Sequence, residues 1–133
     1  MAETVVDMED ARVLVEIRAG DVFDRPGLEA ALAGCRAAFY LVHSMNPEAR
    51  DFASADRKAA ENMAAAAETA GIERIVYLGG LGEEAPQLSH HLRSRHEVGE
   101  ILRRGRVPVT IFRAAMIIGS GSASFEILRH LVR

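Results

Sequence analysis

The chain has 133 residues, of which 49% are hydrophobic and 26% are charged, and its formal net charge is −3. This balance is typical of one folded soluble domain and excludes a disordered chain. The mild acidity argues against a nucleic-acid partner, and no apolar run approaches the roughly 20 residues of a membrane span. Because Cys35 is the only cysteine, an internal disulfide and a cysteine-based zinc site are excluded.

The first ten residues carry four acids and no basic segment, so we expect no signal peptide and a cytoplasmic location. Hydrophobic periodicity then alternates between strand-like and helix-like segments. The predicted elements, in chain order, are a strand at 12–18, a helix at 24–34, a strand at 37–42, a helix at 48–70, a strand at 74–78, a helix at 89–104, a strand at 107–113 and a helix after residue 124.

Glycines and capping residues mark the predicted helix boundaries. Asp24 and Ser89 are suitable N-caps, and Gly34 and Gly71 follow the last apolar positions of two helices. The alternation of strands and helices predicts a parallel sheet with helices on both faces. Ligands of such sheets bind beyond the carboxyl ends of the strands. The candidate positions are therefore Gly20–Asp21, His43–Ser44, Gly79–Gly80 and Arg113–Ala114.

Several motifs, in one order along the chain, resemble the extended and atypical short-chain dehydrogenases/reductases. They are GDVFD at 20–24, YLVHSM at 40–45, RIVYLGGLG at 74–82 and GSGSASFE at 119–126. The resemblance runs from about Val15 to the end of the chain. It is to the NAD(P)-binding branch described as nucleoside-diphosphate-sugar epimerase-like or NmrA-like, and it implies a three-layer α/β Rossmann-like fold.

The family begins with a strand, a glycine-rich turn that holds the cofactor pyrophosphate, a helix and a second strand. No such turn precedes Asp21, and the family's C-terminal substrate region is also missing. We therefore interpret residues 1–133 as a single partial, truncated Rossmann-like domain in which residues 1–11 are flexible. We expect NAD or NADP to bind this chain weakly or not at all.

Without the first βαβ unit, the strand at 12–18 lacks its usual neighbours. It can pair directly with the strand at 37–42, a makeshift strand from residues 4–8 can lie between them, or a second copy can supply the missing edge as a homodimer. We favour direct pairing, because the connection through 24–34 is long enough for one crossover to an adjacent strand.

The resemblance places the adenosine half of the cofactor beside two strand ends. It implies that the Asp21 carboxylate accepts a hydrogen bond from the adenine amino group and that Val22 packs on the ring. The alternative is a turn or capping aspartate. Leu41, Val42 and His43 are expected to line the adenosine and ribose, where His43 either contacts a ribose or caps the end of its strand.

Gly79 and Gly80 occupy the position where the family usually has a serine or threonine that polarises the substrate carbonyl. Glycine cannot make that hydrogen bond, although it lets the backbone approach a nicotinamide closely. A bare turn is the alternative interpretation of the two glycines.

His91 and Arg95 match the positions of the family's Tyr-x-x-x-Lys pair. The resemblance implies an acid/base role for His91 and a ribose or phosphate contact for Arg95. Their four-residue spacing puts both on one helix face, which we predict faces the carboxyl edge of the sheet. The alternative is a solvated basic face together with His90, Arg93 and His96, and we expect no metal site there.

We therefore predict a fragment of an atypical short-chain dehydrogenase/reductase-like protein that acts on an unknown small molecule as an NAD(P)-dependent oxidoreductase or epimerase-like enzyme. The alternative is a non-catalytic NAD(P)-binding sensor or assembly protein. The missing serine or threonine, tyrosine and lysine favour that alternative, and this chain alone is expected to be inactive.

Overall fold

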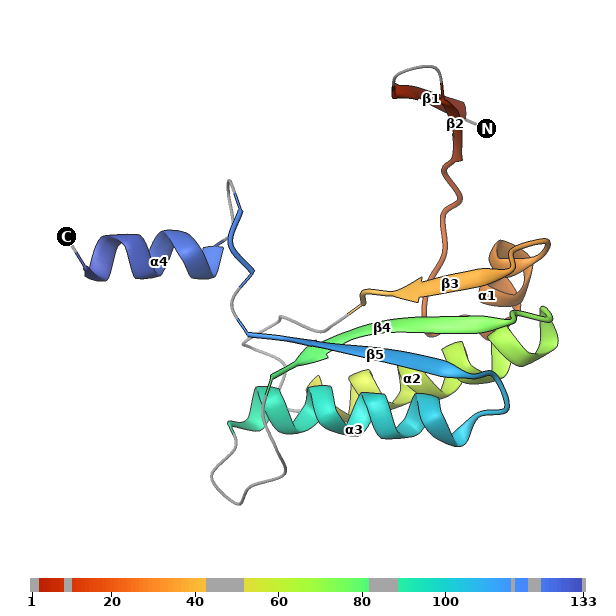
Figure 1. The fold of residues 1–133 in the computed structure, drawn as a ribbon. Helices are drawn as coiled ribbons and strands as arrows, with labels where there is room; N and C mark the ends of the chain where they lie inside the picture. The colour runs from red at the N-terminus through yellow and green to blue at the C-terminus, as the bar shows by residue number, and fades with distance from the viewer. Residues whose placement is uncertain are drawn as a thin grey trace.

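The computed structural model describes residues 3–8, 11–42, 52–81, 89–115, 117–119 and 123–132. The elements are β1 (Glu3–Met8), β2 (Ala11–Glu16), α1 (Arg25–Leu32), β3 (Ala37–Tyr40), α2 (Phe52–Thr69), β4 (Arg74–Gly80), α3 (His90–Arg104), β5 (Val109–Ala114) and α4 (Ala123–Leu131) (Figure 1). From residue 11 onward, this succession confirms the predicted elements, although their bounds differ by a few residues.

Two predicted helix ends are confirmed by backbone geometry. Gly34 and Gly71, which follow α1 and α2, have φ angles of 80° and 73°, a left-handed conformation that favours glycine. Ser89 caps α3, since its hydroxyl oxygen accepts a hydrogen bond from the Leu92 N–H at 3.3 Å. Asp24 lies at the N-cap of α1, but its side chain makes no capping hydrogen bond.

β3, β4 and β5 form a parallel sheet in the order β3-β4-β5. The register pairs Ala38 with Ile75 and Tyr77 with Ile111, and the connecting helices α2 and α3 pack against each other. This arrangement is the truncated Rossmann-like α/β fold that we expected. None of the described helices is long and apolar enough to cross a membrane.

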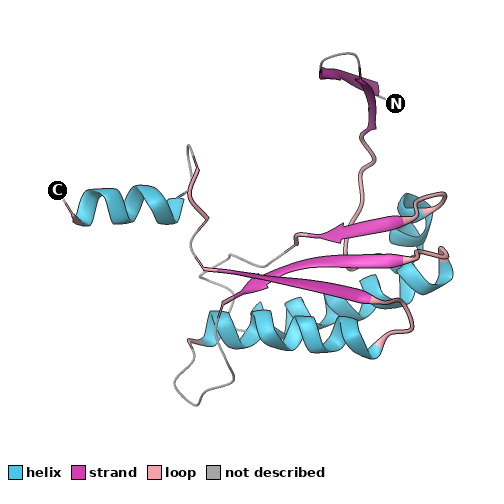
Figure 2. Cartoon of the chain, in the orientation of Figure 1, coloured by secondary structure: helices cyan, strands magenta, loops and turns pink. Residues whose placement is uncertain are grey.

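The described helices that cover this sheet lie on one face of it. Figure 2 shows α2 and α3 together on that face, and α1 packs against α2. The opposite face carries Phe39 and Phe112, whose exposed fractions are 71% and 60%. We expected helices on both faces, so the structure differs from that expectation within its described residues.

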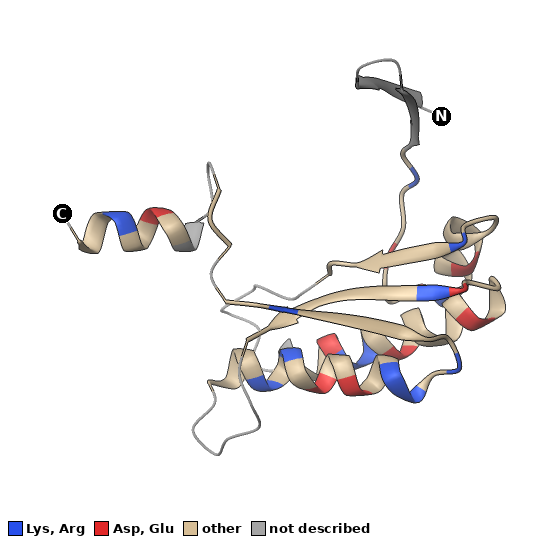
Figure 3. Ribbon diagram, viewed as in Figure 1, with Lys and Arg blue, Asp and Glu red and all other residues tan. Residues whose placement is uncertain are grey.

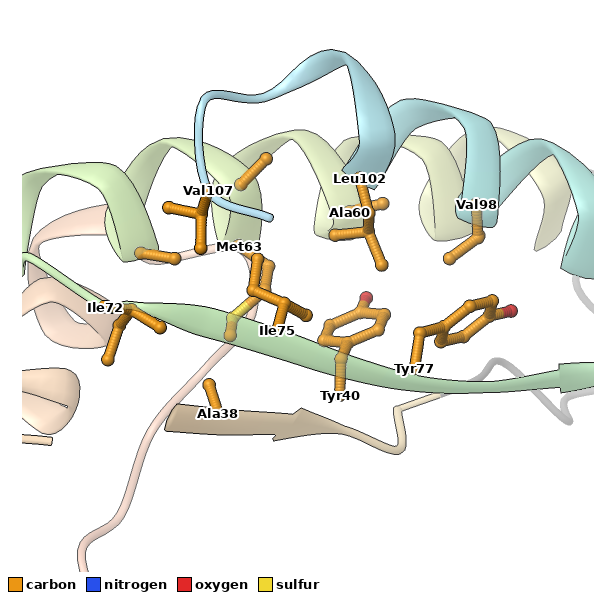
Figure 4. Close-up of a cluster of buried hydrophobic side chains, with 12 residues drawn as sticks. Ala38, Tyr40, Ala60, Met63, Ile72, Ile75, Tyr77, Val98, Leu102 and Val107 are labelled. Carbon is orange, nitrogen blue, oxygen red and sulfur yellow. The ribbon is translucent and has the colours of Figure 1, made fainter. Parts of the chain in front are cut away.

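The core fills the space between the covered face and the helices (Figure 4). Ile75, Tyr77 and Leu102 are its largest fully buried side chains, and the rings of Tyr40 and Tyr77 lie 6.0 Å apart. α2 contributes mainly alanines and Met63, whose small size lets the helix pack close to the sheet. Burial of each large side chain contributes about 1.5–3 kcal/mol.

The prediction that residues 12–18 pair directly with 37–42 is wrong. β2 instead pairs antiparallel with β1, and the two form a separate sheet that stands apart from β3-β4-β5 (Figure 1). The register joins Met8 to Ala11, and a connection of only two residues closes far more easily than the longer one to β3. Residues 4–8 thus form a strand, but it does not lie between β2 and β3. The flexibility of residues 1–11 stays a prediction.

Candidate functional site

The carboxyl ends of β4 and β5 lie beside the first turns of α3. Gly79 pairs with Arg113, and Gly80 pairs with Ala114, at the last positions of the two strands. The Leu92 side chain of α3 lies against Gly80, because a Cβ atom on that glycine would be only 2.6 Å from Leu92 Cδ2. Three segments far apart in the sequence therefore meet at this edge of the sheet.

Arg95 lies at this edge and is held from two sides. Its Nη2 donates a hydrogen bond to the carbonyl oxygen of Leu78, and its guanidinium carbon lies 5.5 Å from the centre of the Tyr77 ring. The Tyr77 hydroxyl in turn donates to the carbonyl oxygen of Arg95 at 3.0 Å. The predicted position of Arg95 at the carboxyl edge is confirmed, while its contact with a cofactor stays a prediction.

A shallow hollow opens between α3 and the helix-facing side of β5. We call it the basic hollow, because three arginines line it. β4 contributes Gly79 and Gly80, α3 contributes Arg95, Glu100 and Arg103, and β5 contributes Arg113. Figure 3 shows the arginines of α3 on the helix that runs beneath the arginine of β5. The structure thus brings together the two predicted glycines, Arg95 and Arg113, which was predicted at the end of its strand. Glu100 and Arg103 were not predicted.

His91 is exposed in the first turn of α3. It does not line the basic hollow, and its side chain makes no hydrogen bond or ion pair with another described residue. Neighbouring His90 and Arg93 are exposed as well, as the alternative of a solvated face requires for these positions. The acid/base role of His91 stays a prediction.

Gly79 and Gly80 are the last two residues of β4, so the interpretation of a bare turn is wrong. A Cβ atom on Gly79 would lie 3.2 Å from the Tyr77 ring, and the Leu92 side chain already fills the corresponding space at Gly80. The protein's own packing therefore accounts for both glycines. Their close approach to a nicotinamide stays a prediction.

Asp21 lies in the loop between β2 and α1 and makes a turn. Its Oδ1 accepts the N–H of Phe23 at 2.8 Å, and its carbonyl oxygen accepts the N–H of Asp24 at 3.0 Å. Asn62 of α2 fixes the loop by donating to the carbonyl oxygen of Val22 at 2.9 Å. The turn is therefore present, and Asp21 is exposed. Binding of adenine by Asp21 and Val22 stays a prediction.

Leu41 and Val42 directly follow β3 at the carboxyl edge. Their exposed fractions are 57% and 45%, so both present apolar surface at the position predicted to line adenosine. His43 lies outside the described residues. The loop that holds Asp21 contributes no residue to the basic hollow. The residues predicted to contact adenine are therefore separate from Gly79 and Gly80, which were predicted to lie near the nicotinamide.

A buried polar cluster behind Arg95 was not predicted. The Ser94 hydroxyl of α3 donates to Oδ2 of Asp56 on α2 at 2.9 Å, and both side chains are buried. Burial raises the pKa of Tyr40 and of Tyr77 above the usual range, and the charge of Asp56 raises the pKa of both further, whereas Arg95 lowers it. Both tyrosines therefore stay protonated at neutral pH and belong to the core.

Sequence signals for this cluster were present. Asp56 interrupts an alanine-rich helix face, and Ser94 lies one residue before Arg95. Tyr40 and Tyr77 lie within the apolar sequences of two strands, so the sequence pattern gives no indication that their hydroxyl groups lie near this cluster. Among the described residues, no group of three or more His, Cys, Asp or Glu is placed to hold a metal ion.

Comparisons with known proteins agree with the family and the fold. A family model described as NAD(P)H-binding matches residues 2–129. None of the curated proteins is similar enough in sequence to match. Among solved structures, Citrobacter sp. triphenylmethane reductase complexed with NADP(H) superposes with a TM-score of 0.63 at 22% identity, over 74% of this chain and 33% of that one.

Two further structures give the same result. A Staphylococcus aureus nucleoside-diphosphate-sugar epimerase has a TM-score of 0.65 at 20% identity, over 77% of this chain and 35% of that one. The Bordetella bronchiseptica enzyme WbmG in complex with NAD and UDP has a TM-score of 0.63 at 20% identity, over 77% and 38%. At such identities the likeness shows the fold alone, and the chain spans little more than a third of these proteins.

Proposed function

Because the chain belongs to the NAD(P)H-binding family, we propose that it forms part of the cofactor site of an oxidoreductase or epimerase-like protein. The observation that carries this proposal is the position of Arg95. Its guanidinium is held between the Leu78 carbonyl and the Tyr77 ring at the carboxyl end of β4, and ligands of parallel α/β sheets bind at that edge.

The residues present fit such a cofactor in part. Arg95 keeps most of its N–H donors for ribose or phosphate oxygens, and exposed Leu41 and Val42 offer apolar surface to an adenosine. The glycine-rich turn that would hold a pyrophosphate is not among the described residues, where β1 and β2 form a hairpin instead. When bound, the nicotinamide supplies hydride transfer. In this proposal His91 exchanges a proton with the substrate, which is an unknown small molecule.

A titration with NADH and with NADPH, followed by two-dimensional NMR, tests the proposal. We expect weak binding, with a dissociation constant of about 1 mM or roughly 4 kcal/mol of binding free energy, because the pyrophosphate contacts are missing. The shifted signals should cluster at Arg95, Leu41 and Val42. Arg95→Gln should weaken binding severalfold, and Arg93→Gln, an exposed neighbour on α3, should leave it unchanged.

A dissociation constant in the micromolar range would contradict the expected weak binding, because it would show that a pyrophosphate site exists without the glycine-rich turn. Other results would contradict the proposal itself. Shifts confined to other parts of the chain, or equal effects of Arg95→Gln and Arg93→Gln, would remove Arg95 from the cofactor site.

A non-catalytic NAD(P)-binding sensor or assembly protein is the second candidate. The positions of the tyrosines and the lysine favour it: Tyr40 and Tyr77 are buried in the core, and the only lysine, Lys58, is exposed on α2 rather than on α3. Oxidation of NAD(P)H in the presence of carbonyl compounds separates the candidates. Turnover that His91→Ala abolishes supports an enzyme, whereas cofactor binding without turnover supports a sensor.

We also propose that a second copy of the chain pairs with the open edge of β3. That edge has no neighbour among the described strands, and unpaired strand edges are templates for association. Sedimentation equilibrium of the chain tests this proposal. A monomer at all concentrations would contradict it.

A further inference from the structure

The basic hollow carries an inference that goes beyond binding of a dinucleotide. We infer that it binds an oxyanion, either a carboxylate or a phosphate, between Arg113 of β5 and the arginines of α3. The chain as a whole is acidic, with a formal net charge of −3. Against that background, the hollow gathers three arginines and a single carboxylate.

The single carboxylate does not neutralise the hollow. Glu100 is already engaged, since its Oε1 lies 3.2 Å from Nη1 of Arg103 on the next turn of α3. Arg95 is held by a neutral carbonyl and an aromatic ring. Two of the three guanidinium groups therefore have no carboxylate partner among the described residues.

Arg113 is the most informative of these residues. Several arginines elsewhere in the chain form an ion pair with a glutamate at 3.2 Å or less. These pairs are Arg25–Glu29, Arg36–Glu73, Arg57–Glu97 and Arg106–Glu68. The Arg113 side chain makes no hydrogen bond or ion pair with the described residues, although it lies on the same side of β5 as α3 and lines the hollow. No other described residue uses any of its five side-chain N–H donors.

Close packing of α3 on the sheet brings the charges together. A Cβ atom on Gly99 would lie 3.0 Å from Ile111 Cδ1, so only glycine lets the helix approach β5 without a shift. This approach sets Arg95 and Arg103 on the wall opposite Arg113. Arginines that line one hollow suit the planar, paired oxygens of a carboxylate or the oxygens of a phosphate, which accept two parallel hydrogen bonds from one arginine.

The test is a titration of the 133-residue chain with inorganic phosphate, and separately with acetate, at constant ionic strength. The Nε–Hε signals of the arginines are followed by NMR. We expect the signals of Arg113 and Arg95 to shift with saturation. Arg113→Gln should weaken binding about tenfold, the effect of losing a charge-assisted hydrogen bond. Arg106→Gln, an exposed variant outside the hollow, should leave affinity unchanged.

A variant of opposite sign sharpens the test. Glu100→Gln removes the negative charge from the hollow and frees Arg103, so it should tighten phosphate binding severalfold. The inference is overturned if no arginine signal in the hollow saturates. It is also overturned if Arg113→Gln and Arg106→Gln weaken binding equally, because that result describes general attraction of anions to surface charge.

A competition identifies the source of the oxyanion. If NADPH displaces phosphate and NADH does not, the hollow takes the additional phosphate of NADPH. If phosphate stays bound in the presence of both dinucleotides, the hollow takes an anionic group of the substrate. Because inorganic phosphate is the probe, the inference survives a failure of dinucleotide binding, and the two proposals fail separately.

Discussion

The two faces of the three-stranded sheet have the same backbone and opposite surroundings. On the covered face, Ile75 and Tyr77 are 0% and 1% exposed, whereas Phe39 and Phe112 on the open face are 71% and 60% exposed. Alternation of side chains along each strand places neighbours in sequence on opposite faces. The comparison teaches that an apolar residue in a strand contributes to stability only where a second layer covers it.

The covered face also contains the buried polar groups that form hydrogen bonds between the two helices and between a helix and the sheet. Ser94, Asp56 and the hydroxyl of Tyr77 are buried between the helices and the sheet, and each has a hydrogen-bond partner there. A parallel sheet is normally buried on both faces, so the open face is the exception to explain. The following predictions measure how far the two faces differ.

The largest effect should come from the covered face. Ile75→Ala removes a fully buried side chain, and we expect the free energy of unfolding in urea to fall by about 3 kcal/mol. Val76→Ala, the next residue on the open face, should cost clearly less. Equal losses at the two positions would show that the faces do not differ.

The buried hydrogen bond between α3 and α2 should have the second-largest effect. Ser94→Ala leaves the Asp56 carboxylate without its hydroxyl donor, so we expect a loss of about 2 kcal/mol in the free energy of unfolding. Arg93→Ala, an exposed change on the same helix, should stay within about 0.5 kcal/mol of the parent chain. A loss at Ser94 as small as that at Arg93 would show that this hydrogen bond does not stabilise the fold.

The pH dependence of stability should report the burial of Tyr40. Burial raises its pKa, with a further contribution from Asp56, above the value of about 10 for an exposed tyrosine. The folded chain then keeps the proton when the unfolded chain loses it. Stability is therefore fully present below about pH 10 and falls as the pH rises above that value. In Tyr40→Phe the urea midpoint should depend less steeply on pH above about pH 10 than it does in the parent chain. The same pH dependence in both chains would contradict burial of the hydroxyl.

The smallest effect should come from the open face. Phe39→Ala removes a large side chain that is mostly exposed, so the free energy of unfolding should change by no more than about 0.5 kcal/mol. The same variant should reduce any self-association in sedimentation experiments, because it removes apolar surface beside the open edge of β3. A loss in the monomer comparable with that of Ile75→Ala would show that another segment covers this face.

Local signals in the sequence predicted the elements well. Periodicity located the strands and helices from residue 11 onward, Gly34 and Gly71 marked helix ends, and Ser89 marked a cap. The partner of β2 was not predictable in the same way, because strand propensity does not specify a neighbour. A hairpin with the adjacent strand has the shorter connection to close.

The candidate site was predictable only in its local part. The motif on α3 led to Arg95, whose position at the sheet edge is confirmed. Arg113 was predicted as a strand-end position, and its pairing with Gly79 puts it beside Arg95. Arg103 joins them only through the packing of α3 at Gly99. These contacts depend on strand register and helix spacing, which no single segment encodes. A turn at Asp21 is one of the two alternatives that the sequence predicts, but the hydrogen bond from the Phe23 N–H to its carboxylate depends on the conformation of the loop.

The direction in which the chain crosses the sheet has a consequence for the open face. The connection from β3 to β4 and the connection from β4 to β5 each move to the next strand in the same direction across the sheet. Because such crossovers are right-handed, connections that move in the same direction place their helices on the same face of the sheet. Only a connection that steps back toward the edge of β3 sets a helix over Phe39. Further units of the same kind beyond β5 would widen the sheet and leave that side bare, so the direction of travel, rather than the side chains, decides which face is covered.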